Sequence, residues 1–252
     1  MSETGWRLTM FAGIDLRGPD ASAAQSILVQ PKHVALLAFL EIESAMSRQR
    51  RFARRDHLVG VLWPELDQTH ARAALRRVIH QIRTALGPEL LISRGDEELS
   101  INEAAFGSDV RQFVGAVTGS QLSHALEVYA GDLMPGFHLN ACTDFEHWLD
   151  GRRDHLRREA GAAAWALAQR LETERDFTQA GQIARRAVQY AWDDERMLRR
   201  ALEMLDRLGD RSGALRLYRE FTRRLRAEFD AEPSQETQAL VARLRAAPPS
   251  SP

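Results

Sequence analysis

The spacing of apolar and polar positions predicts two consecutive helices in the first half of this 252-residue chain. Residues 56–63 predict a helix of about two turns, which Pro64 ends because proline cannot continue a helix. Asp67 is a suitable cap for a second helix, which is expected to run to Leu86 and to end at Gly87. The pattern therefore predicts two helices joined by a short turn.

Two short apolar runs follow the second helix. Residues 90–93 and 99–101 flank a polar segment that contains Gly95, as expected for a hairpin with a loop of about three to five residues. Many bacterial proteins use the order helix, turn, helix and hairpin to place one helix in the major groove of DNA. The sequence thus predicts a winged helix.

The second helix has two distinct faces when its residues are placed 100° apart. The apolar face consists of Ala71, Leu75, Val78, Ile79, Ile82 and Leu86. The opposite face consists of Thr69, His70, Ala73, Arg76, Arg77, His80, Gln81 and Thr84. Arginine pairs well with a guanine edge and glutamine with an adenine edge, so this face is suited to reading bases. The alternative is an ordinary solvated helix face in an arginine-rich protein.

Charge is concentrated around these helices. Residues 48–83 contain nine arginines against three acidic residues, a local charge of +6, whereas the whole chain carries −1. Such a patch supplies affinity for phosphates. Lys32 is the single lysine, so the use of arginine at any one position is weak support for a functional role. The acidic residues 96–98 at the hairpin turn oppose a contact between the hairpin and DNA.

The segment before these helices predicts a small sheet and one buried helix. Residues 6–13 and 27–30 are β-prone runs, with a turn beginning at Arg17 between them, so residues 6–30 are expected to form a small sheet. Residues 32–44 are almost continuously apolar and predict a buried helix. This leading segment completes a first domain over residues 1–108.

The chain changes character at about Asp109 and becomes helical throughout. Residues 176–181 align with residues 210–215 at an offset of 34, the period of the tetratricopeptide helix hairpin. The sequence predicts about three such hairpins and a closing helix over residues 235–246, within a second domain over residues 109–247. Such a stack offers a surface for protein contact, or serves only as a rigid dimerisation scaffold. The last residues, 248–252, predict a disordered tail.

Composition limits the classes of protein. The chain is 44% hydrophobic and 27% charged, as in a globular protein, and no apolar run approaches the roughly 20 residues of a membrane span. The single cysteine, Cys142, excludes an internal disulfide and is expected to be buried or half-buried. With no signal peptide visible, we expect a cytoplasmic protein without a membrane partner. No catalytic, cofactor or metal motif is present, so an enzyme is not expected.

Motifs spread over nearly the whole chain resemble those of the SARP-type transcriptional activators of bacteria. In the first part they are residues 62–64, 71–87 and 109–113. The second part resembles the bacterial transcriptional activator domain in residues 129–137, Trp148, Arg152, Arg153 and residues 193–195, 214–218 and 229–233. The resemblance implies an OmpR-like winged helix joined to a tetratricopeptide-like domain, that is, a mainly α protein.

The resemblance also implies a function. SARP-type activators bind direct repeats in promoter DNA, often as paired protomers, and recruit RNA polymerase through its sigma subunit. By this resemblance the outward face of the second helix reads bases in double-stranded promoter DNA, and a possible homodimer forms on that DNA. Arginines near this face are the candidate phosphate contacts: Arg54, Arg55, Arg72, Arg83 and Arg94. Arg83 lies near the buried stripe and has the alternative of a structural ion pair.

A second hypothesis stays open from the sequence. The winged helix is then degenerate and does not bind DNA, and the chain is a tetratricopeptide-like adaptor for a partner protein. The acidic hairpin and the near-neutral net charge favour the adaptor, whereas the +6 segment opposes it. Salt dependence distinguishes the two, because contacts with phosphates release counterions.

Overall fold

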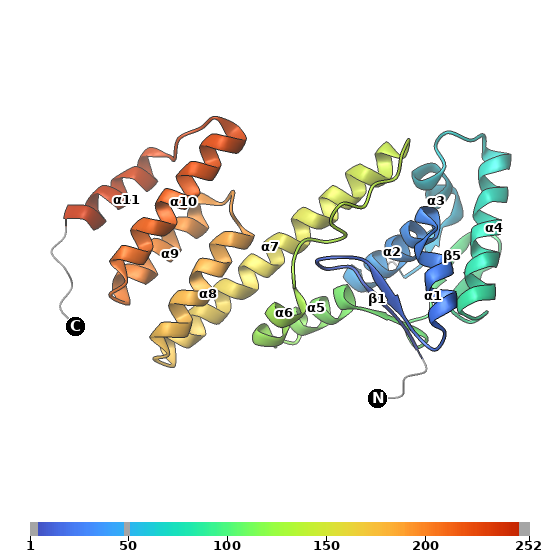
Figure 1. Cartoon of the computed structure of the whole chain (residues 1–252), viewed down its shortest axis with the longest axis horizontal. Coiled ribbons are helices and arrows are strands. Elements are labelled where there is room, and N and C mark those ends of the chain that lie inside the picture. The colour runs from blue at the N-terminus through green and yellow to red at the C-terminus, as the bar shows by residue number, and fades with distance from the viewer. Residues whose placement is uncertain (1–4, 48–50, 247–252) are drawn as a thin grey trace. The chain divides into compact units, whose positions relative to one another are not determined.

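The computed structural model describes residues 5–47 and 51–246 (Figure 1), so the predicted tail over residues 248–252 lies outside the described residues. The chain divides into two compact units, Met1–His155 and Leu156–Pro252. The first contains small sheets and helices, and the second is entirely helical over its described residues. This confirms the predicted fold class of a mainly α chain with an N-terminal α+β part.

A three-stranded sheet forms the start of the first unit. Strand β1 (Trp6–Thr9) pairs antiparallel with β2 (Asp15–Arg17) and parallel with β6 (Phe106–Ser108). The sequence predicted strand structure near β1, but it gave no signal for β6, which is three residues long and contains Gly107. The parallel pairing joins segments that lie about a hundred residues apart in the chain.

The predicted strand over residues 27–30 is wrong. Helix α1 (Ala21–Leu28) occupies most of this segment, and the Asp20 side chain caps it by accepting hydrogen bonds from the backbone N–H groups of Ser22 and Ala23. Ala24 and Ile27 are buried three residues apart, which is the spacing of one helix face. The N-cap and this spacing outweigh the β-propensity of the apolar run.

Helix α2 (Pro31–Met46) is the central element of the first unit and confirms the predicted buried helix. Its Glu41 is fully buried, and the Arg111 guanidinium donates to both carboxylate oxygens, at 2.8 and 2.7 Å. The Ser108 hydroxyl donates a third hydrogen bond to Glu41, at 2.7 Å. These bonds hold helix α5 (Asp109–Thr118) and the end of β6 against α2. Helix α6 (Leu122–Val128) packs on α5.

The predicted helix–turn–helix and hairpin are present. Helix α3 (Arg55–Leu62) is followed by α4 (Gln68–Leu86), with Trp63 as the C-cap of α3. Strands β4 (Leu91–Arg94) and β5 (Glu98–Ile101) form the hairpin. The sequence gave no indication of β3 (Ala53–Arg54), which pairs with β5 and makes a three-stranded wing in the order β3-β5-β4.

Helix α2 begins beside the only lysine and the only cysteine of the chain. The Lys32 Nζ lies 2.9 Å from the Cys142 Sγ and also donates to the Leu62 carbonyl at the end of α3. Cys142 is buried, as the sequence predicted, while the Lys32 side chain stays 27% exposed. One amine thus connects the beginning of α2, the end of α3 and the segment before helix α7.

Helix α7 (Thr143–Thr173) begins in the first unit and continues into the second. Within the first unit, the Trp148 Nε1 donates to Glu43 of α2 at 2.8 Å, and Arg152 forms an ion pair with the same carboxylate. Arg153 donates to the backbone carbonyls of Leu133 and Met134. Residues of the family motif therefore fasten α7 to α2 and to the preceding loop.

The second unit confirms the predicted repeat. Its further helices are α8 (Phe177–Tyr190), α9 (Glu195–Arg207), α10 (Arg211–Phe229) and α11 (Gln235–Ala246). Asp176 caps α8 and Asp210 caps α10, each by accepting a backbone N–H three residues later. These two residues are the ones that the 34-residue offset aligned, and the predicted closing helix coincides with α11.

Along the chain, the boundary between the two compact units falls between residues 155 and 156, within α7. Helices α5 and α6 therefore belong to the first unit by their packing, although they follow the change in composition at Asp109. The predicted domain boundary at residues 108 and 109 stays a prediction. Among the described residues no single helix is long and apolar enough to cross a membrane. The pair α1 and α2, bent by 99°, passes on length and composition alone.

One hydrogen bond fixes the end of α4 to the first sheet. The buried Trp6 Nε1 donates to the carbonyl of Leu86 in the last turn of α4, at 2.7 Å. Gly18 lies against the Trp6 indole so closely that an added Cβ would come within 2.7 Å of three ring carbons. Because the hydrogen bond holds the indole in place, the ring cannot move away without releasing the α4 terminus.

Gly18→Ala is expected to lower the free energy of unfolding by about 1–3 kcal/mol, the usual cost of overpacking. Gly13→Ala is the matched control, because a Cβ there meets nothing within 4 Å. Urea denaturation of the two variants and the wild type measures the difference. Equal stability of the two variants would contradict the proposed fit between Gly18 and Trp6.

Candidate nucleic-acid interface

The beginning of α4 is fixed by an N-cap. The Asp67 Oδ1 accepts hydrogen bonds from the backbone N–H groups of Thr69 and His70, at 2.9 and 3.1 Å, as the sequence predicted for this cap. The backbone and side-chain hydrogen bonds from His70 lower the pKa of Asp67 below its ordinary value. An ionised carboxylate at this position also suits the positive end of the helix dipole.

The structure brings the predicted base-reading residues onto one outward face of α4. Ala73 is partly exposed and the other seven are exposed, while the opposite face is buried against the first unit. Six of the eight line a shallow surface groove along the helix: His70, Ala73, Arg76, Arg77, His80 and Gln81. The side chains available to a ligand on this face therefore form a continuous strip.

Members of this face differ in how free they are. Within the described residues, the side chains of Arg76, Arg77 and His80 make no hydrogen bond or ion pair. Three others already have partners inside the protein, and one of them is His70, whose Nδ1 lies 2.5 Å from the Asp67 Oδ2. The Gln81 amide lies 3.0 Å from the His33 Nε2 of α2, and the Thr84 hydroxyl donates to the backbone carbonyl of His80. Unoccupied donors are thus concentrated in the middle of the helix.

The candidate phosphate contacts divide in the same way. Arg54 is exposed at the N-terminus of α3 and has no side-chain partner among the described residues. Arg72 donates to one oxygen of Asp56, at 2.6 and 3.0 Å, and this ion pair connects α4 to α3. The Asp56 hydrogen bond and its charge raise the pKa of Arg72. Arg72 therefore keeps only part of its guanidinium free for a phosphate.

Two further arginines anchor the wing. The Ser93 hydroxyl of β4 accepts hydrogen bonds from Arg55 of α3 and from Arg83 of α4, both at 3.0 Å. Arg83 also donates to the Leu91 carbonyl at 2.8 Å. The alternative left open for Arg83 was an ion pair, and its observed partners are instead a hydroxyl and a carbonyl. The sequence contained no signal for Ser93, because its role depends on two helices converging on one strand.

The wing tip is mostly acidic and its one arginine is occupied. Arg94 stacks over the Phe52 ring at 3.8 Å and forms an ion pair with Glu98 at 3.3 Å. Asp96 lines a cavity of about 240 Å³ together with three arginines of the helix–turn–helix. Those arginines are Arg55, Arg72 and Arg76. The cavity gathers positive charge between the wing and α4, and Asp96 offsets part of it.

Comparison with known proteins places the chain in a family. The profile of the bacterial transcriptional activator domain matches residues 112–245, which is more than half of the chain. The chain belongs to this family. The match confirms the resemblance to SARP-type activators, and the chain is a SARP-family transcriptional regulator. This is not a class of enzyme.

A solved structure of the Mycobacterium tuberculosis protein EmbR, in complex with a low-affinity phosphopeptide, has a similar fold. The TM-score is 0.53 at 18% sequence identity, and the match covers 98% of this chain and 66% of EmbR. The SARP-family chain thus spans about two thirds of the length of EmbR. No curated protein matches the chain.

The contact between α2 and α4 of this SARP-family regulator involves a titratable group. Burial lowers the pKa of His33 below its ordinary value, and the hydrogen bond with Gln81 opposes this only in part. The second ring nitrogen of His33, Nδ1, is buried and has no hydrogen-bond partner in the described structure. The neutral ring is therefore the form that fits between α2 and α4.

Acidification is expected to destabilise the winged helix through His33. As the pH falls below about 6.5, the unfolded chain takes up this proton before the folded chain does, so the free energy of unfolding decreases. His33→Gln should remove that part of the decrease. Denaturation midpoints at about pH 8 and about pH 5.5 for the wild type and the variant measure it. An equal change in both proteins would contradict the assignment.

Proposed function

We propose that this SARP-family regulator binds double-stranded promoter DNA in a sequence-specific manner, with α4 in the major groove. The observation that carries the proposal is the pair Arg76 and Arg77. Both are exposed in the middle of a helix whose other face is buried, and neither has a partner within the described residues. Free guanidiniums at this position are suited to bidentate bonds with guanine edges.

Local charge and pairing support the same proposal. Of the nine arginines over residues 48–83, Arg55, Arg72 and Arg83 are drawn into contacts that shape the fold. Arg54, Arg76 and Arg77 are not, and a free guanidinium placed beside a phosphate or a base edge gains affinity without breaking an internal bond. The proposed division is that Arg76 and Arg77 read bases with their neighbours on α4, while Arg54 and Arg55 position the backbone.

The family resemblance adds finer expectations to the proposal. The regulator is expected to bind direct repeats, with a homodimer forming on the DNA, and to recruit RNA polymerase through its sigma subunit. The helical second unit is the proposed surface for these protein contacts. The acidic wing is expected to contribute little affinity for DNA, because carboxylates at residues 96–98 repel phosphates.

The second candidate function is the adaptor that does not bind DNA. The observation that favours it is the wing, whose one arginine is paired with Glu98 and whose Asp96 lies at the arginine-lined cavity. Binding measured over a series of salt concentrations distinguishes the candidates. A DNA-binding protein loses affinity steeply with added salt, whereas an adaptor shows no salt-dependent binding to duplex DNA at all.

Selection on a random duplex library tests sequence-specific binding. The wild type is expected to enrich a tandemly repeated motif, and the double variant Arg76→Ala, Arg77→Ala should lose or change that motif. Arg216→Ala is the matched control, because Arg216 is an exposed arginine without a partner on α10 of the other unit. Absence of enrichment by the wild type at low salt would favour the adaptor.

The single variant Arg77→Ala is expected to weaken binding to the selected site by about 1–3 kcal/mol and to relax specificity at one position. Fluorescence anisotropy with the selected site and with single-base variants of it measures both effects. An equal loss on all sequences would assign Arg77 to a phosphate. Unchanged binding would remove it from the interface.

Arg54→Ala is expected to behave differently, since a phosphate contact is indifferent to sequence. Affinity should fall by a similar factor on specific and non-specific duplexes, and the negative slope of log K against log salt should become shallower by about 1. Titrations at several salt concentrations measure this slope. A loss confined to the selected site would instead make Arg54 a base contact.

A further inference from the structure

A groove between α9 and α11 in the second unit is lined mainly by arginines. Its volume is about 540 Å³, and its walls come from both helices. The charged residues are Arg196, Arg199, Arg200, Arg243, Glu203 and Glu236. Ala239 and Leu240 of α11 add an apolar part. Four guanidiniums against two carboxylates leave an excess of two positive charges in the groove.

The arginines of this groove have two different roles. Arg199 holds α9 and α11 together, because it bonds to Glu236 at 3.0 Å and to the Thr237 hydroxyl at 3.0 Å. Arg243 lies 3.6 Å from Glu203. The side chains of Arg196 and Arg200 are exposed and make no hydrogen bond or ion pair within the described residues. The excess positive charge is therefore located on these two side chains.

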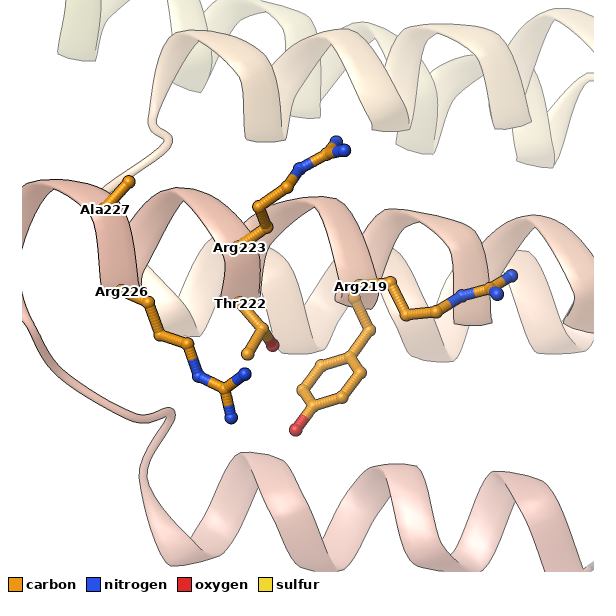
Figure 2. A pocket seen from close by; sticks show the side chains of 6 residues that line it. Arg219, Thr222, Arg223, Arg226 and Ala227 are labelled. Atoms are coloured by element: carbon orange, nitrogen blue, oxygen red, sulfur yellow. The ribbon is translucent and has the colours of Figure 1, made fainter.

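A pocket elsewhere on the same unit is also lined by arginines, but it differs from this groove in how those arginines are paired. Figure 2 shows a pocket on α10, where Thr222 and Arg226 point to one side of the helix and Arg223 points away from them. Two of its three arginines form ion pairs within the protein, and the third, Arg219, donates to the Leu215 carbonyl at 3.3 Å. Arg226 pairs with Glu232, and Arg223 lies 3.8 Å from Glu220. That pocket presents no comparable pair of free cations.

The spacing of the two free arginines indicates how far apart two negative charges on a ligand should be. Arg196 and Arg200 are four residues apart on α9, so their side chains lie on the same face, about 6 Å apart at the Cβ atoms. Two carboxylates four residues apart on a helix match this spacing, as do two carboxylates two residues apart on an extended segment. Each arginine can then form a charge-assisted, bidentate hydrogen bond.

We propose that the α9–α11 groove binds an acidic segment of a partner protein. The apolar part formed by Ala239 and Leu240 favours a peptide that also carries apolar side chains. Glu203 and Glu236 oppose a continuous phosphate backbone, because their carboxylates would face a charge on every nucleotide. This binding activity goes beyond the reading of DNA and does not depend on it.

A fluorescent peptide of repeated Glu-Glu-Leu units, with Gln-Gln-Leu as its neutral counterpart, tests the proposal on the full chain. The wild type is expected to bind the acidic peptide at low salt and to ignore the neutral one. Arg196→Glu with Arg200→Glu should weaken binding at least tenfold. Arg216→Glu is the matched control and should bind as the wild type does, since Arg216 lies outside the groove. All variants should keep the wild-type melting temperature and affinity for duplex DNA.

Several results would overturn the proposal. They are no binding by the wild type, equal binding by the groove variant, and equal loss in the Arg216→Glu control. A labelled single-stranded oligonucleotide that competes for the groove would assign it to nucleic acid. Self-association that the groove variant abolishes would assign it to a second copy of this chain. If the charge reversal prevents folding, the double variant Arg196→Gln, Arg200→Gln replaces it in the test. This variant is also expected to bind the acidic peptide more weakly than the wild type.

Discussion

A carboxylate buried in the middle of an apolar helix sets the geometry of the first unit. Glu41 has no access to water, and an ion at such a position is tolerated only when its charge and lone pairs are matched. Arg111 and Ser108 match them, and their hydrogen bonds hold β6 and α5 against α2. The same helix contacts α4 through His33 and α7 through Glu43. Helix α4 and the start of α7 are therefore both positioned by α2.

The role of each arginine in this chain depends on whether its side chain has a partner, and the number of arginines in a segment does not show it. The local charge of +6 over residues 48–83 counts two kinds of arginine together: those bonded within the protein and those free to bind a ligand. Arg83 illustrates the first kind, because its bonds to Leu91 and Ser93 join α4 to the wing. Arg77 illustrates the second, because nothing in the described protein competes for it. The same distinction separates Arg199, which joins α9 to α11, from Arg196 beside it.

The sequence predicted those features that arise from neighbouring residues. Asp67 at the start of α4 and Gly87 at its end act within one helical turn, so local rules located them. Asp176 and Asp210 were aligned by the 34-residue offset, and the structure adds that both are N-caps. Features that depend on distant segments were missed. The short β6 strand is stable only because β1 accepts it, and Ser93 matters only because two helices converge on it. Periodicity identified the eight outward residues of α4. It did not show which of their side chains lack a partner within the protein.

The contact between Lys32 and Cys142 has a practical consequence for handling this protein. The two side chains most often modified by chemists and by cells, an amine and a thiol, each occur once and touch each other where α2, α3 and the segment before α7 meet. A thiol-selective reagent meets a buried sulfur in the native protein, and the lysine amine beside it is 27% exposed. Opening of the winged helix exposes both at once. Labelling kinetics at this one junction therefore report opening of the winged helix.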